Sequence, residues 1–166
     1  FMQRALDNII HDVALQNLPV IMMLDRAGIV GEDGATHHGA FDLAYLKYIP
    51  NITIMAPANE TELQDMLNTA LTLKHPSVIR YPRGSGTRIA SFHRDFEILE
   101  TGKSKLEKEG KDACIVCLGN VLEKCLEAAQ LLENKGMSVS VLNMRFLKPF
   151  DNFGVSYLDL SEYDFS

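Results

Sequence analysis

The stretch that decides the fold runs from Pro19 to Asp42 and reads PVIMMLDRAGIVGEDGATHHGAFD. Its first six residues are apolar and have the length and composition of a fully buried strand. A loop that contains four glycines follows, and five residues that can bind ligands or transfer protons crowd into it: Asp25, Arg26, Asp33, His37 and His38. Because ligands in open α/β sheets bind just beyond the carboxyl ends of the strands, this loop is a candidate site. The alternative is a polar, glycine-rich surface turn.

Outward from this loop, helical and strand-like segments alternate. Residues 1–17 and 41–47 are predicted helices, and residues 52–55 and 78–81 are predicted strands. Asn59 is expected to cap a further helix, with Glu62 three residues later in capping-box spacing, and Leu63, Met66, Leu67 and Ala70 on its buried face. This order predicts an α/β fold with a parallel, doubly wound sheet.

The second half of the chain predicts an incomplete α/β unit. Residues 113–118 and 139–142 are expected strands, and residues 121–134 form the expected helix between them, stopped by Gly136. We therefore expect a first domain over residues 1–90, a linker over residues 91–111 with one strand at 96–99, and a truncated second domain over residues 112–166. The lysines between residues 103 and 111 are interpreted as a solvated face.

Composition excludes several classes of protein. The 166 residues carry a formal net charge of −6, which argues against nucleic acid or an anionic membrane as the main partner. The sequence contains no apolar run long enough for a membrane span and no signal peptide, so a cytoplasmic location is expected. Since the chain begins at Phe1 inside a predicted helix, we expect further residues upstream.

The three cysteines suggest a reducing compartment more than a disulfide framework. Cys114 and Cys117 form a C-x-x-C, but in a strand residues three apart point to opposite faces. We interpret them as core cysteines and expect no metal ligand in this chain.

Three segments resemble one enzyme family. DRAGIVGEDGATHHGAFD at residues 25–42, IPNITIMAPANETEL at 49–63 and VIRYPRG at 78–84 are similar to the 1-deoxy-D-xylulose-5-phosphate synthases, thiamine-diphosphate enzymes of the transketolase superfamily. Residues 111–151 resemble the opening of the transketolase C-terminal domain, and the similarity stops after Asp151. The DG-x-TH core is common to transketolases, whereas DRAGIVG and HHGAFD point to the synthases.

The resemblance implies a reaction and its participants. Synthases of this family condense pyruvate, after decarboxylation, with glyceraldehyde 3-phosphate, and they use thiamine diphosphate and Mg²⁺. A homodimer is expected for the complete enzyme. The motifs that bind the diphosphate and Mg²⁺, and the glutamate that activates the aminopyrimidine, belong to a part of the family sequence that this chain does not contain. The isolated chain is therefore expected to be inactive.

The resemblance also assigns roles to individual residues. Arg26 and Arg83 match the arginines that bind the substrate phosphate, and guanidinium groups suit phosphate oxygens. The alternative for each arginine is a surface ion pair, for Arg26 with Asp25. His37 and Asp33 match catalytic residues that act near the reacting carbon and hold the acceptor hydroxyl. Phe1 and Arg4 match cofactor-binding positions. His38 is better interpreted as bonded to the backbone of its own loop.

Two alternative functions remain open. A transketolase or the β-subunit of a 2-oxoacid dehydrogenase would use the same fold and cofactor with other substrates. A non-catalytic binding module that kept the fold would lack turnover altogether.

Overall fold

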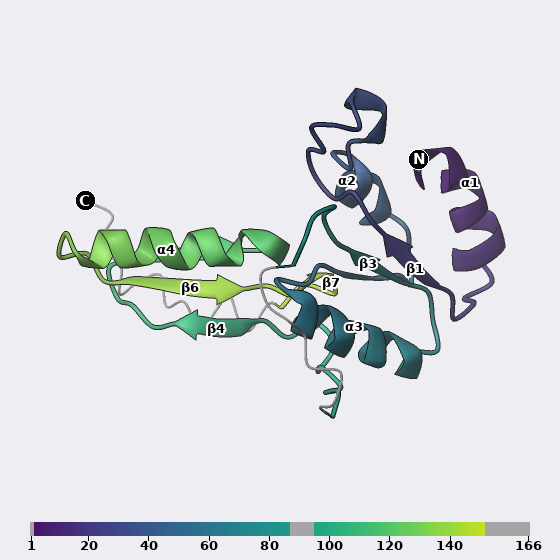
Figure 1. Ribbon diagram of the computed structural model, residues 1–166. Coiled ribbons are helices and arrows are strands. Elements are labelled where there is room, and N and C mark those ends of the chain that lie inside the picture. The colour runs from purple at the N-terminus through teal and green to yellow at the C-terminus, as the bar shows by residue number, and fades with distance from the viewer. Residues whose placement is uncertain (1, 87–94, 152–166) are drawn as a thin grey trace.

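The computed structural model describes residues 2–86 and 95–151. Its first sheet contains β1 (Ile21–Leu24), β2 (Thr53–Met55), β3 (Ser77–Arg80) and β7 (Phe146–Lys148), in the order β1-β3-β2-β7 (Figure 1). The first three of these strands are parallel, as the sequence predicts, and β7 joins antiparallel to β2. The predicted parallel sheet is therefore confirmed for β1, β2 and β3, and the antiparallel strand β7 extends it at one edge.

Helices cover both faces of this sheet. On one face, Ile54 and Val78 pack with the N-terminal helical segments and with α2 (Asp42–Leu46). On the other face, Met55 and Ile79 pack against Met66 and Ala70 of α3 (Glu60–Thr72). This alternation is what a doubly wound sheet requires of buried strands. The N-terminal segment, predicted as one helix, consists of η1 (Met2–Ala5), α1 (Leu6–Asn8) and η2 (Ile9–Ala14), which has π-helical hydrogen bonding.

Helix α3 begins as its sequence predicts, and it buries Met66 and Ala70 with Leu63 packed beside them, as predicted, but Leu67 is exposed. Asn59 Oδ1 accepts a hydrogen bond from the Glu62 amide at 3.0 Å. Leu67 is 38% exposed, whereas Asp65 and Thr69 are buried. Asp65 and Thr69 are buried because the segment over residues 97–99 packs on them. The Glu97 amide donates to Asp65 Oδ1 at 2.9 Å, and the Leu99 amide donates to Thr69 Oγ1 at 2.8 Å. The strand predicted at residues 96–99 is therefore absent: this segment bonds to side chains of a helix.

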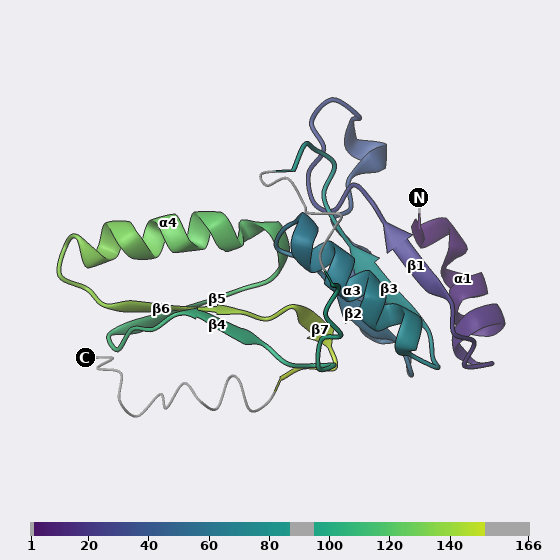
Figure 2. The same cartoon turned by 60° about the horizontal axis from the view of Figure 1, so that its bottom comes forward.

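The second sheet contains β4 (Lys105–Lys108), β5 (Ala113–Cys117) and β6 (Val139–Asn143), in the order β4-β6-β5. Strands β5 and β6 are parallel, and β4 is antiparallel to β6. Helix α4 (Leu122–Glu133) follows the short turn η4 (Gly119–Val121) and lies along one face of this sheet (Figure 2). Strand β4 lies inside the segment predicted as a linker. The sequence does not indicate it because its residues are mostly charged, which is common in edge strands, and its backbone pairs with β6.

The two sheets are joined by the chain and by side chains. Strand β6 leads directly into β7, which belongs to the first sheet (Figure 1). At this junction Glu62 of α3 accepts hydrogen bonds from Arg145 Nε at 2.7 Å and from Asn143 Nδ2 at 3.2 Å. The side chain of Glu62 is 8% exposed and that of Arg145 is 19% exposed. A largely buried ion pair therefore ties the second unit to the first.

The three cysteines, all within the described residues, form no disulfide. Cys114, Cys117 and Cys125 are free thiols, and the buried Cys117 Sγ lies 3.5 Å from the Leu142 carbonyl oxygen. Over residues 2–86 and 95–151, no helix has the length and apolarity needed to cross a membrane.

Candidate functional site

The candidate site is built where β1 and β3 end side by side. The two strands are parallel, and Leu24 lies opposite Arg80. Their pairing continues beyond the strands: the Tyr81 amide donates to the Leu24 carbonyl at 2.9 Å, and the Ala27 amide donates to the Tyr81 carbonyl at 3.0 Å. The loop after β1 and the residues after β3 are therefore held at the same edge of the sheet, which is where the sequence predicts a site.

This pairing brings Arg26 and Arg83 to one carboxylate. Arg26 Nε donates to Asp33 Oδ2 at 3.0 Å, and Arg83 Nη1 donates to Asp33 Oδ1. Arg26 also forms the ion pair with Asp25 that the sequence offers as the alternative, so the two interactions coexist. The side chain of Asp33 is 18% exposed, and those of Arg26 and Arg83 are 35% and 45% exposed. The result is an anchored pair of guanidinium groups at the surface of the loop.

The charges in this cluster stabilise one another. Partial burial would raise the pKa of Asp33, but hydrogen bonds from Arg83 and Arg26 outweigh it and hold that pKa below its ordinary value of 3.8. The hydrogen bond to Asp33, followed by the charge of Asp25, raises the pKa of Arg26. Both groups are therefore ionised at neutral pH.

The two adjacent histidines have different surroundings. His38 Nδ1 accepts a hydrogen bond from the Val30 amide at 3.1 Å, so this ring closes the loop on its own backbone, as expected. His37 ends the short 3₁₀ turn η3 (Ala35–His37), and its Nδ1 lies 3.0 Å from Thr36 Oγ1. His37 is only partly buried.

A cavity of about 350 Å³ lies between the loop and the N-terminal helical segment. Arg26 and both histidines contribute polar groups to its wall, and the apolar part comes from Met2, Met23, Phe41 and Tyr45. Burial and then the charge of Asp42 raise the pKa of Tyr45 to about 12, so its phenol is a neutral donor at physiological pH. The cavity thus combines apolar walls with titratable groups.

Neither of the two residues predicted to bind the cofactor, Phe1 and Arg4, is among the described residues that line this cavity. Phe1 lies outside the described residues. Arg4 lies on η1 with an exposed side chain, and it is not among the described residues that line the cavity, although its neighbours Met2 and Gln3 are.

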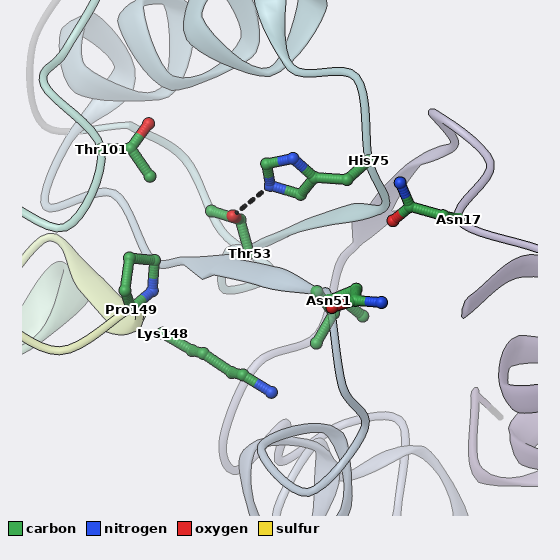
Figure 3. Close-up of a pocket in the computed structure, with 8 residues that line it drawn as sticks. Asn17, Asn51, Thr53, His75, Thr101, Lys148 and Pro149 are labelled. Atoms are coloured by element: carbon green, nitrogen blue, oxygen red, sulfur yellow. Dashed lines mark hydrogen bonds between the residues drawn. The ribbon is translucent and has the colours of Figure 1, made fainter. Parts of the chain in front are cut away.

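A second cavity, of about 440 Å³, is lined by residues at the amino ends of β2 and β3, away from the loop. Figure 3 shows Thr53, His75 and Lys148 around it. These polar side chains serve neighbouring protein groups: His75 Nε2 lies 2.8 Å from Thr53 Oγ1, and Lys148 Nζ donates to the carbonyls of Lys47, at 3.2 Å, and Ile49. Burial lowers the pKa of Lys148. Since this cavity lies at the amino ends of the strands and its histidine and lysine are already bonded to protein groups, it is the weaker candidate.

Comparison with known families identifies the fold and its relatives. Residues 1–88 match the model described as the transketolase pyrimidine binding domain. This chain belongs to the transketolase family. Residues 102–158 match the transketolase C-terminal domain, so both halves of this transketolase-family chain have counterparts.

Several curated relatives carry the same name. The chain is 55% identical over 162 residues to the 1-deoxy-D-xylulose-5-phosphate synthase of Chlorobium phaeovibrioides, which covers 97% of this chain and 25% of that protein. It is 53% identical over 152 residues to the synthase of Chlorobaculum tepidum, covering 91% of this chain and 24% of that protein. The chain therefore spans about a quarter of the length of these relatives.

Solved structures agree on the fold. A split-gene transketolase, described as an inactive beta4 tetramer, superposes with a TM-score of 0.80 at 32% identity, covering 93% of this chain and 49% of that chain. A transketolase from Pichia stipitis superposes with a TM-score of 0.70 at 24% identity, covering 84% and 21%, and supports the fold alone.

Enzymes of this family use thiamine diphosphate with a divalent metal, and the described residues can be compared with the pyrimidine end of that cofactor and with its metal. The apolar walls of the loop cavity, with a histidine at hand, suit a flat heteroaromatic ring such as the pyrimidine. Over residues 2–86 and 95–151, no cluster of three His, Cys, Asp or Glu side chains could hold a metal ion. The described residues therefore fit the pyrimidine, and no side-chain group among them is suited to hold the metal.

Sequence reasoning missed three residues at this site. Tyr45 and Asp42 line the cavity, and Arg80 bonds to Asp42 beneath it. Arg80 ends an apolar strand within the quoted VIRYPRG, and a charged residue at that position is the signal that could have drawn attention to it.

Proposed function

We propose that this chain is the pyrimidine-binding part, with the start of the C-terminal domain, of a 1-deoxy-D-xylulose-5-phosphate synthase. The reaction condenses pyruvate with glyceraldehyde 3-phosphate and releases CO₂. Its product, 1-deoxy-D-xylulose 5-phosphate, is a precursor of isoprenoids and thiamine. The single observation that carries the proposal is the convergence of Arg26 and Arg83 on Asp33, at the sheet edge where His37 also lies. The identity of 55% to a synthase supports it.

The two arginines are proposed to anchor the substrate phosphate. Each guanidinium has five N–H donors, and the bonds to Asp25 and Asp33 leave donors on both groups. Because Asp33 holds the two side chains, little conformational entropy is lost when they bind a dianion. A phosphorylated acceptor is the substrate class that this arrangement suits.

His37 and Asp33 are proposed to act on the acceptor. Thiamine diphosphate, when bound, supplies the electron sink that lets a 2-oxo acid lose CO₂. The His37 imidazole has two ring nitrogens, and a positioned histidine of this kind is the commonest general acid or base in enzymes. Asp33 is ionised, so a free lone pair on its carboxylate would accept a hydrogen bond from the acceptor hydroxyl.

Further parts of the proposal concern the complete protein. We propose thiamine diphosphate and Mg²⁺ as its cofactors, with Phe1 and Arg4 on the cofactor side, and a homodimer located in the cytoplasm. The three free thiols are compatible with a reducing compartment. We keep residues 1–90, 91–111 and 112–166 as the proposed domains and linker.

The competing functions differ in substrates. A transketolase would transfer a two-carbon unit between sugar phosphates, and a 2-oxoacid dehydrogenase β-subunit would use no sugar phosphate. A binding module would show no turnover. The sequence HHGAFD and the identity to synthases favour the synthase.

The test is to insert this chain in place of the matching quarter of a synthase and to measure product from pyruvate and glyceraldehyde 3-phosphate. We expect product from the chimaera and none from the isolated chain, in line with the split-gene transketolase described as an inactive tetramer. Turnover of the chimaera with other sugar phosphates but not with pyruvate would contradict the proposal. Turnover by the isolated chain would contradict the expectation that it lacks half of the cofactor site.

A further inference from the structure

The last residue of β3 bonds to the loop that carries the proposed site. Arg80 Nε donates to Asp42 Oδ2 at 2.8 Å, and Arg80 Nη2 donates to the Gly39 carbonyl oxygen at 2.8 Å. The side chains of Arg80 and Asp42 are 17% and 7% exposed. The other carboxylate oxygen of Asp42 accepts from the Leu43 amide at 2.9 Å, at the start of α2. Both oxygens of a buried carboxylate are thus satisfied, and Arg80 links a strand, a loop and a helix.

Gly39 is the point where the loop closes on itself. Its amide lies 3.1 Å from the Arg26 carbonyl and 2.9 Å from the Gly28 carbonyl, and its own carbonyl accepts from the Gly28 amide at 3.1 Å. A Cβ atom at position 39 would lie 2.5 Å from the Arg26 carbonyl oxygen, so only glycine fits this approach. We call this contact between Gly39 and residues 26–28 the loop neck.

The groups used by the proposed function extend from this neck. Arg26 lies in the neck itself, with a left-handed backbone at φ 60°, and Asp33 and His37 lie on the loop that the neck closes. A displacement of Gly39 would therefore move the phosphate-binding and proton-transfer groups together. An error of about 1 Å in the position of reacting groups is enough to cost about 100-fold in rate.

We propose that Arg80 is a positioning residue that fixes the loop neck by bonding Asp42 and the Gly39 carbonyl at the same time. A guanidinium offers two donors in one rigid plane, whereas the single ammonium of lysine cannot reproduce that fork. The consequence for catalysis rests on the proposed function, but the effect on the neck does not. Arg80 contacts no group expected to react, so it acts only through the loop.

The first arm of the test measures the neck directly in the 166-residue chain. Hydrogen exchange at the Gly28 and Gly39 amides should become about 10- to 100-fold faster in Arg80→Lys, because a charge-assisted hydrogen bond to the neck is lost. Arg145→Lys is the matched control: it disturbs an ion pair of similar burial, with side chains 19% and 8% exposed, whose guanidinium bonds to Glu62 of α3 and not to the loop. We expect unchanged exchange at both glycines in this control. Unchanged exchange in Arg80→Lys would overturn the proposal.

The second arm measures activity in the chimaeric synthase. Arg80→Lys should lower kcat/KM for glyceraldehyde 3-phosphate by about 10- to 100-fold, with Arg145→Lys at the unmodified value. The double variant Arg80→Met/Asp42→Leu removes both partners and so leaves no unpaired buried carboxylate. It keeps the test valid if the single variant unfolds. It should lose at least as much activity as Arg80→Lys. An active Arg80→Lys enzyme with an opened neck would overturn the positioning role. If the unmodified chimaera shows no synthase activity, the proposed function fails, and the exchange arm alone decides whether Arg80 fixes the neck.

Discussion

Asp33 and Arg83 are 50 residues apart in the sequence, yet their side chains form an ion pair. The pair exists because β1 and β3 are adjacent parallel strands whose hydrogen bonding continues to Ala27 and Tyr81. Arg26 bonds to the other oxygen of the same carboxylate. The relative position of the two arginines is therefore set by the sheet and by Asp33 together.

The first prediction concerns the pH range over which this cluster persists. A carboxylate whose pKa is lowered in the folded state stabilises the fold above its unfolded pKa, and the stabilisation is lost as the pH falls through the folded pKa. Since the pKa of Asp33 lies below 3.8, the cluster should stay intact throughout the neutral and mildly acidic range and open only below that value. Carboxyl-carbon NMR titration, with Asp33→Asn to assign the signal, checks this. A midpoint above about 4 would show that the arginines do not hold the carboxylate.

The second prediction concerns the junction between the two sheets. Glu62→Ala leaves Arg145 without its carboxylate partner, and breaking a buried ion pair from one side should lower the free energy of unfolding by about 3 kcal/mol. Urea denaturation measures the change. The matched control is Glu127→Ala, an exposed glutamate on α4, which should stay within about 0.5 kcal/mol. A loss below about 1 kcal/mol for Glu62→Ala would show that the junction contributes little to stability.

The third prediction concerns thiol reactivity. Burial, followed by the neighbouring Cys125, raises the pKa of Cys117 to about 12. At pH 8 only about one part in 10⁴ of this thiol would be ionised, so alkylation by iodoacetamide should be slowest at Cys117. Peptide mass spectrometry compares it with Cys114 and Cys125, which are partly exposed. In urea all three should react at similar rates, and preferential labelling of Cys117 in the folded chain would contradict the assignment.

Much of the fold follows from local sequence patterns. Apolar runs and the Asn59 cap place β1, β2, β3 and α3 to within a few residues, because buried parallel strands and helix starts have strong local signals. Strand β4 has no such signal, since its residues Lys105–Lys108 are mostly charged and its position depends on backbone pairing with the distant β6. Sequence alone therefore misses an element whose partner is non-local.

The candidate site also contains some features that the sequence predicts and others that it does not. The loop and both arginines are visible in the sequence, and strand order explains why they meet. The bonds of Arg80 to Asp42 and Gly39 span 38 and 41 residues, so no local pattern indicates them. The separate surroundings of His37 and His38 likewise depend on how the loop folds back toward Val30.

The fourth prediction concerns proton transfer in the chimaeric synthase. His37→Ala should lower kcat by about 10²- to 10⁴-fold, because general acid–base catalysis acts only as bonds change. His75→Gln is the control, since His75 lies in the second cavity, away from the loop, and glutamine retains a hydrogen-bonding group near Thr53 (Figure 3). A rise in KM with unchanged kcat for His37→Ala would assign His37 to binding instead.

The most direct test of the proposed phosphate site is how well the Arg83→Ala variant of the chimaeric synthase uses the acceptor phosphate. This variant removes one of the two guanidinium groups held by Asp33. A charge-assisted contact is worth about 1.5–3 kcal/mol, which corresponds to a loss of about one to two orders of magnitude in kcat/KM. The measurement compares steady-state kinetics with glyceraldehyde 3-phosphate and with unphosphorylated glyceraldehyde. We expect kcat/KM to fall for the phosphorylated acceptor and to change little for glyceraldehyde. An equal loss for both acceptors would show that Arg83 does not bind the phosphate.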